Sequence, residues 1–184
     1  MDILLQMDGE VLLWIQEHLR KEFLNPIVMF ITGLGDAGWF WILLCVILLF
    51  SKQYRKTGIT GLFALLIGFI ITNLFLKNAV MRVRPYEMIE GLQLIGKSAR
   101  DFSFPSGHST ASIAASTVFL IKLPKKFGVF SFLLGALICF TRLYIGIHYP
   151  TDVIAGILIG LFAAYAAVFL MDRKKESADT FHLF

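Results

Sequence analysis

The stretch "DFSFPSGHSTASIAASTVFLIK" (101–122) decides how the chain is organised, because it places a small polar group at the start of an apolar run. On length alone, residues 108–122 make a weak transmembrane helix, since a span needs about 20 apolar residues. A crossing is nevertheless needed at this point to carry the chain back across the membrane. We therefore predict a span that begins next to Ser106, Gly107 and His108.

The composition places the chain in a membrane. Of its 184 residues, 57% are hydrophobic and only 16% are charged, and a water-soluble domain of this size would need far more polar surface. Four further apolar runs are long enough to cross a bilayer: 26–50, 57–76, 127–147 and 151–171. Cys45 and Cys139 lie inside such runs and read as small buried hydrophobic residues, without the spacing of a metal site.

These runs predict an all-α integral membrane protein with one domain over residues 1–184. The catalytic bundle would occupy 26–171 and contain five transmembrane helices. The segment "GLGDAG" (33–38) interrupts the first run with three glycines and a carboxylate. An alternative of six spans follows if this segment is a loop between two shorter helices.

Residues 1–23 differ from the other apolar segments because charges recur regularly among their apolar residues. We expect an amphipathic helix that lies in the membrane interface. The first twenty residues contain four acidic residues and no basic start before an apolar run, which argues against a secretory signal.

Basic residues orient the predicted bundle. They cluster after the first span, after the third and after the last: Lys52, Arg55, Lys56, Lys122, Lys125, Lys126, Arg173, Lys174 and Lys175. Alternating spans place all of these on one side, which the positive-inside rule identifies as the cytoplasm. Residues 172–184 would then form a cytoplasmic tail, and the loop 77–107 would face outward.

Three cations are expected at the outward end of the bundle: Lys77, Arg84 and Arg142. Charges near transmembrane segments are expensive and call for a reason. The only acid that the sequence places nearby is Asp152, so a surplus of positive charge remains. A phosphate would neutralise it, because arginine binds phosphate oxygens in pairs.

Ser106 and Gly107 precede the predicted helix 108–122. Backbone N–H groups at a helix start carry partial positive charge and suit phosphate oxygens. The absence of a side chain at Gly107 lets a ligand approach the backbone closely. We therefore expect both residues to bind phosphate together with the three cations.

Two histidines complete the predicted site. Asp152 follows His148 by four residues, about one helical turn, and can hold one ring nitrogen while the other faces the cations. Such an oriented neutral imidazole is a nucleophile. His108 has no acid close in sequence and is free to donate a proton to a leaving oxygen.

Each cluster alone has a simpler explanation. Lys77, Arg82 and Arg84 could anchor lipid headgroups, and Ser106 could be a helix cap. His148 with Asp152 could be a structural hydrogen bond or half of a metal site. Together they supply complementary parts at one membrane level. We expect no metal ion and no cofactor, because further metal ligands are missing nearby and the surroundings are cationic.

The motifs resemble those of the type 2 phosphatidic acid phosphatase family. Lys77 with Arg84-Pro85, the run Pro105-Ser106-Gly107-His108, and Arg142 with His148 and Asp152 match its three signatures over roughly residues 57–171. The resemblance implies that His148 forms a phosphohistidine, His108 is the general acid and Asp152 orients His148. It also implies that Lys77, Arg84, Ser106, Gly107 and Arg142 bind phosphate. Thr141 stands where the family usually has serine, and it keeps a hydroxyl.

The resemblance implies a phosphatase for a membrane lipid. We expect hydrolysis of undecaprenyl diphosphate to undecaprenyl phosphate at the outer face of a bacterial cytoplasmic membrane. A phosphatidylglycerophosphate or phosphatidate phosphatase is the alternative within the family, and a lipid or anion transporter is the alternative of another class. The expected partners are the lipid substrate and the bilayer, with no nucleic acid and no signal for an oligomeric state. The loop 86–104 is either a lid over the site or a solvated connection.

Overall fold

The computed structural model describes residues 3–181, with side chains described from Ile3 to Arg173. All regular elements in this range are helical. They are α1 (Ile3–His18), the 3-10 turn η1 (Glu22–Leu24), α2 (Asn25–Gly33), the 3-10 turn η2 (Asp36–Gly38), α3 (Trp39–Leu49), α4 (Arg55–Phe69), the π-helical η3 (Ile70–Leu76), α5 (Lys77–Val80), α6 (Pro85–Met88), α7 (Gly107–Lys122), α8 (Lys125–Tyr144) and α9 (Pro150–Phe181).

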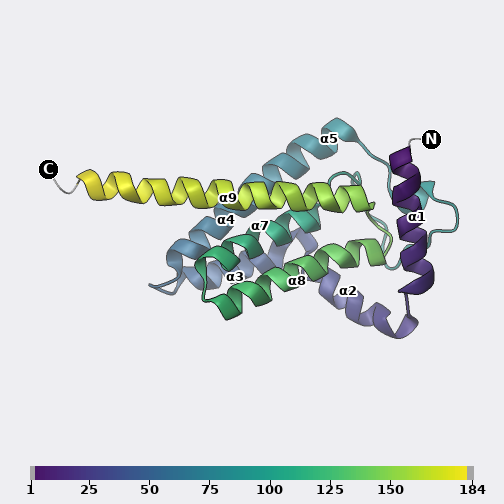
Figure 1. Ribbon diagram of the computed structural model, residues 1–184, viewed down its shortest axis with the longest axis horizontal. Helices are drawn as coiled ribbons and strands as arrows, with labels where there is room; N and C mark the ends of the chain where they lie inside the picture. Colours follow the sequence, from purple (N-terminus) through teal and green to yellow (C-terminus); the bar gives the residue numbers. More distant parts are fainter. Residues whose placement is uncertain (1–2, 182–184) are drawn as a thin grey trace.

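The short helix α7 forms the centre of the bundle. It packs against α4, α8 and α9 and also contacts α3 (Figure 1). Most of its side chains from Ser109 to Phe119 are buried. The polar residues that weaken its hydropathy therefore face protein and not lipid.

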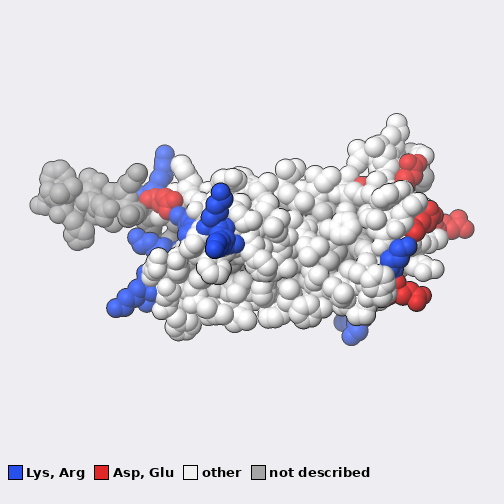
Figure 2. All heavy atoms as spheres, turned by 60° about the horizontal axis from the view of Figure 1, so that its bottom comes forward, with Lys and Arg blue, Asp and Glu red and all other residues white. Residues whose placement is uncertain are grey.

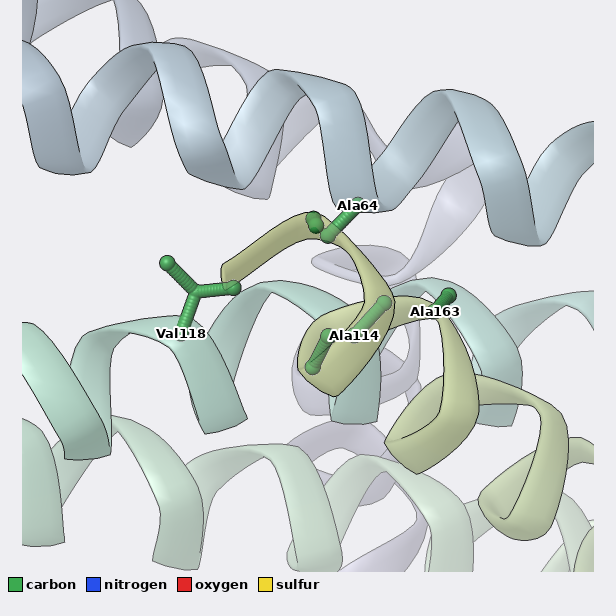
Figure 3. Packing of buried hydrophobic residues seen from close by; sticks show 6 residues of the cluster. Ala64, Ala114, Val118 and Ala163 are labelled. Carbon is green, nitrogen blue, oxygen red and sulfur yellow. The ribbon is translucent and has the colours of Figure 1, made fainter. Parts of the chain in front are cut away.

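Small residues let the neighbouring helices approach α7 closely. Ala64 of α4, Ala114 and Val118 of α7 and Ala163 of α9 meet in one buried cluster (Figure 3). A methyl group added at Gly160 of α9 would lie 2.8 Å from a backbone oxygen of α7, so no larger residue fits there. Close backbone approach of this kind is how helices associate where lipid supplies no hydrophobic driving force.

The described residues contain three stretches long and apolar enough to cross a membrane: Arg55–Met88, Lys125–Tyr144 and Pro150–Arg173. A fourth arises if Glu22–Gly33 and Asp36–Leu49 are one span bent by 43°. With 16 residues, α7 is shorter than these. The all-helical membrane bundle is therefore confirmed, whereas the number of five or six spans stays a prediction.

The predicted interruption at 33–38 is confirmed as a break between α2 and α3. Helix α2 ends at Gly33, and the backbone of Ala37 and Gly38 then has positive φ angles of 48° and 67°, which redirects the chain just before α3 begins. Glycine adopts this conformation without steric strain. The break brings η2 against α7, close to His108.

Helix α1 lies across one end of the bundle (Figure 1). It contacts α8 and α9, and its buried residues are Asp8, Gly9, Leu12 and Ile15, while large apolar residues of its opposite face are exposed. The exposed set is Ile3, Leu4, Met7, Val11 and Trp14. These positions form one stripe at helical spacing, as a helix in the membrane interface requires. The interfacial location itself stays a prediction.

Charged side chains gather at the two ends of the molecule, and the face between them shows few charged residues (Figure 2). Most of the visible lysines and arginines lie at the end where α9 finishes, and most of the visible acids lie at the end covered by α1. Lys174 and Lys175, which belong to the predicted inner clusters, lie outside the described side chains. Helix α9 continues past residue 171 into the predicted tail.

Candidate active site

Residues from all three predicted clusters line one pocket of about 980 Å³. Six of the eight predicted site residues line it: Lys77, Arg84, Gly107, His108, Arg142 and His148. The other two, Ser106 and Asp152, are fully buried beside it. The expected meeting of three distant segments at one level is thus present in the structure.

One part of the pocket wall is apolar. It is lined by Ile42 of α3 and by Leu62, Leu65, Leu66 and Phe69 of α4. The same cavity therefore offers cations and imidazoles at one part of its wall and aliphatic and aromatic side chains at another. An amphiphile with an anionic head matches this arrangement.

His148 and Asp152 form the pair that the sequence predicts. His148 Nδ1 lies 3.4 Å from Asp152 Oδ2, and the two side chains are 2% and 0% exposed. Burial lowers the pKa of His148 to about 3, although the hydrogen bond to Asp152 acts in the opposite direction. The ring is therefore neutral at pH 7. When the N–H of the neutral ring is at Nδ1 and donates to Asp152, Nε2 carries a lone pair that faces the pocket.

Asp152 has further partners that fix its orientation. Its Oδ2 accepts hydrogen bonds from the Ser103 hydroxyl and, at 3.0 Å, from the backbone N–H of Tyr149. Its Oδ1 accepts a hydrogen bond of 2.7 Å from Arg82, whose guanidinium stacks 3.7 Å from the centre of the Tyr149 ring. Neither Ser103 nor Arg82 was among the predicted site residues. For Arg82 the signal in the sequence was its position between Lys77 and Arg84, two residues before Arg84.

Arg84 contacts the histidine directly. Its Nη1 donates to the carbonyl oxygen of Ile147 at 2.9 Å and lies 3.1 Å from His148 Nε2. Its Nη2 donates to the Asp101 carboxylate at 2.6 Å. The predicted phosphate-binding arginine thus bridges the nucleophile candidate and an acid.

Asp101 corrects the expectation that Asp152 is the only acid near the cations. Its carboxylate binds both Lys77 and Arg84, although its side chain is about half exposed. Burial raises the pKa of Asp101, but the hydrogen bond and charge of Lys77 together with Arg84 outweigh this and hold it below its usual value. Asp101 escaped prediction because it lies in a loop with no helical register to place it.

Ser106 caps α7, which is the simpler role that the sequence also allows. Its hydroxyl oxygen accepts from Ser109, as an N-cap of α7 does, and its own N–H donates to the Asp152 carbonyl oxygen at 3.0 Å. The N–H and the hydroxyl oxygen of Ser106 are therefore engaged by protein, and phosphate binding by Ser106 stays a prediction. The backbone donors that remain at the start of α7 belong to Gly107 and His108, which line the pocket.

His108 has an acid partner after all, contributed from far away in the chain. Its Nε2 lies 2.8 Å from Asp36 Oδ1 in the break between α2 and α3. The Asp36 side chain is 68% exposed and that of His108 is 17% exposed. Gly35 fits beside the ring, since an added methyl group would lie 2.6 Å from His108. The carboxylate inside "GLGDAG" was the only signal in the sequence for this contact.

Arg142 stands on α8 with its side chain buried. Its Nη1 donates to the Thr32 hydroxyl at 2.6 Å, and its buried Nε has no hydrogen-bond partner among the described residues. A buried guanidinium with a free donor favours an anionic ligand in the pocket. Over residues 3–173, no group of three or more His, Cys, Asp and Glu is placed to hold a metal ion.

Comparison with known proteins identifies a family model, described as the PAP2 superfamily, that matches residues 57–176. Two relatives are undecaprenyl-diphosphatases. One, from Sulfolobus acidocaldarius, is 29% identical over 79% of this chain and 69% of its own length. The other, BcrC from Bacillus subtilis, is 31% identical over 87% of this chain and 81% of its own. Phosphatidylglycerophosphatase B from Bacillus subtilis is 32% identical over 78% of this chain and 73% of its own length.

Two solved structures share the fold. A transmembrane PAP2-type phosphatidylglycerolphosphate phosphatase from Bacillus subtilis superposes with a TM-score of 0.78 and 24% identity, covering 94% of this chain and 88% of that chain. LpxE from Aquifex aeolicus superposes with a TM-score of 0.75 and 22% identity, covering 86% of this chain and 93% of that chain. The helical bundle described above is therefore also the fold of these two solved structures.

Proposed function

The chain belongs to the PAP2 superfamily, and on that premise we propose that it is a membrane lipid phosphatase acting on lipid diphosphates. The preferred substrate is undecaprenyl diphosphate, which it converts to undecaprenyl phosphate. The observation that carries this proposal is the single pocket in which His148, the cations and an apolar wall occur together. Two undecaprenyl-diphosphatases among the relatives support the choice of lipid.

The reaction proceeds in two steps. The Nε2 lone pair of neutral His148 attacks the terminal phosphorus, the bond from phosphorus to the bridging oxygen breaks, and the lipid phosphate leaves with that electron pair. His108 donates a proton to the leaving oxygen and is neutral afterwards. Water then attacks the phosphohistidine, His108 accepts its proton, and inorganic phosphate departs as His148 regains its lone pair.

The remaining residues bind the phosphoryl group. Lys77, Arg84 and Arg142 neutralise its charge, and the N–H groups of Gly107 and His108 hold its oxygens. Ser106 contributes by capping α7 and so fixing these donors. In the structure Arg84 Nη1 is within hydrogen-bonding distance of His148 Nε2. Arg84 must therefore leave this nitrogen and bind the phosphate before the nitrogen can attack.

A second candidate substrate is phosphatidylglycerophosphate. It is favoured by the relative phosphatidylglycerophosphatase B and by the structural similarity to a phosphatase of that type. The two substrates share a phosphate on a lipid anchor and differ in the group that leaves.

The test is release of inorganic phosphate by purified protein in detergent. Undecaprenyl diphosphate, phosphatidylglycerophosphate and phosphatidate are compared at equal concentration, with a chelator present and with vanadate as inhibitor. We expect the diphosphate to be preferred, turnover to survive the chelator, and vanadate to inhibit strongly. A preference for another lipid would overturn the substrate, and activity that returns only with Mg²⁺ would overturn the mechanism.

The same proposal places the pocket on the outer face of a bacterial cytoplasmic membrane, because the basic end of the molecule is the opposite end (Figure 2). Gln93 is exposed near the pocket end and Gln53 is exposed in the connection between α3 and α4. In intact cells a membrane-impermeant thiol reagent should label Gln93→Cys and spare Gln53→Cys. The reverse pattern would overturn the orientation. Cys45 and Cys139 are buried and give little background.

A further inference from the structure

Asp8 is an unusual residue of α1, because it is a buried carboxylate on a helix that covers the end of the bundle. Asp8 is 3% exposed, whereas Glu10 and Glu17 of the same helix are exposed. Helix α1 also lies outside residues 57–176, the part that matches the family model. A buried charge is costly and persists only with partners that compensate it.

The partners of Asp8 all belong to the segments that carry the candidate site. Its Oδ2 accepts from Arg82 Nη2 at 2.8 Å and from the Thr151 hydroxyl. Its Oδ1 accepts from the backbone N–H of Thr151 at 3.1 Å. Because Thr151 lies in the first turn of α9, Asp8 satisfies a free donor at the positive end of that helix from 143 residues away.

Arg82 connects Asp8 to the catalytic carboxylate. Its Nη1 donates to Asp152 Oδ1 and to the Thr151 hydroxyl, both at 2.7 Å, while its Nη2 holds Asp8. The guanidinium thus lies between two buried carboxylates. Without Asp8, Arg82 would lose one of the two anions that fix its position, and the start of α9 would lose its cap.

We propose that Asp8 is a positioning residue that holds Asp152, and through it His148, in the geometry for attack. The proposal rests on the proposed function in one respect, namely that Asp152 orients the nucleophile. It makes α1 part of the catalytic unit, since this surface helix supplies the residue behind Arg82. Asp8 does not line the pocket and touches no reacting atom.

The test compares Asp8→Asn with Glu10→Gln, a change of the same kind at an exposed position of α1. Single-turnover hydrolysis of undecaprenyl diphosphate and inhibition by inorganic phosphate, the product that binds the same cations, are measured for both. Because a displacement of about 1 Å can reduce a rate by about a hundredfold, we expect Asp8→Asn to slow the single turnover by roughly ten- to a hundredfold. Inhibition by inorganic phosphate should stay within about twofold, since the phosphate-binding cations are unchanged. Glu10→Gln should match the unmodified protein.

A double-mutant cycle separates positioning from general damage. If Asp8 acts through Asp152, Asp8→Asn should add little to the defect of Asp152→Asn. A multiplied defect would overturn the inference, and so would an unaltered rate in Asp8→Asn. Should that variant fail to fold, Thr151→Val removes the hydroxyl shared by Asp8 and Arg82, and the same cycle with Asp152→Asn decides. Failure of the proposed function would show differently, as an unmodified protein that releases no phosphate from any lipid of the panel.

Discussion

His148 and His108 line the same pocket, yet they are held by partners of different kinds. His148 is buried and contacts Asp152, which is also buried and four residues further along the chain. His108 is more exposed, and its partner Asp36 is exposed and 72 residues away. One imidazole is therefore fixed in protein, and the other stands where water can reach its carboxylate.

The difference fits two chemical tasks. A nucleophile must stay neutral and keep one geometry, and burial together with a fixed carboxylate provides both. A proton donor must exchange its proton between turnovers, which access to water permits. If this division is correct, substitutions at the buried pair have large effects on every substrate, and those at the exposed pair have smaller effects that depend on the leaving group.

The largest effect is expected for His148→Ala. Loss of the nucleophile closes the covalent route, so the rate should fall on the order of 10⁶-fold on both monophosphate and diphosphate lipids. Phosphate release measures it, with His18→Ala on α1 as the matched control at an exposed histidine. Substantial turnover in His148→Ala would show that another group attacks phosphorus.

Asp152→Asn should come next, with residual activity. The amide fills the same space but stabilises neither the proton on Nδ1 nor the positive ring formed during attack, and the corresponding change in serine proteases costs about 10⁴ in rate. Single-turnover hydrolysis of the preferred lipid measures the loss. A rate equal to that of the unmodified protein would remove Asp152 from the mechanism.

His108→Ala should separate substrates by their leaving groups. A monophosphate lipid expels an alkoxide with a pKa of about 16, so loss of the proton donor should cost most of the 10²- to 10⁴-fold typical of general acid catalysis. A diphosphate lipid expels a phosphate whose second pKa is about 6 and needs less help. The measurement is the single-turnover rate on both lipids. Equal slowing would make His108 a phosphate-binding residue instead.

The smallest effect is expected for Asp36→Asn. Exposed ion pairs contribute little, so the rate on a monophosphate lipid should fall by less than about fivefold and the rate on a diphosphate lipid should hardly change. Asp172→Asn is the matched control, because Asp172 is similarly exposed and pairs with Lys122 at the other end of the molecule. A loss as large as that of His108→Ala would mean that Asp36 takes part in the proton transfer itself.

The sequence by itself determined the membrane class, the apolar runs and the residues that meet in the pocket. Hydropathy and short motifs are local properties, and the pairing of His148 with Asp152 needs only one helical turn. The break at 33–38 was equally local, because glycines and a carboxylate interrupt an apolar run there. The central position of α7 was not visible in the same way. Its serines and alanines lower its hydropathy, whereas packing on several sides is what makes them suitable.

Only the tertiary structure decided which distant charges lie together. Four such contacts join residues 17 to 74 positions apart in the chain. Asp36 contacts His108, Asp101 contacts both Lys77 and Arg84, and Asp8 contacts Arg82. Such contacts follow from how helices and loops pack, and no periodicity within one segment encodes them. A charged residue in a membrane protein indicates that a partner is present, because an unpaired charge there is costly. Which residue is the partner depends on the arrangement of the whole bundle.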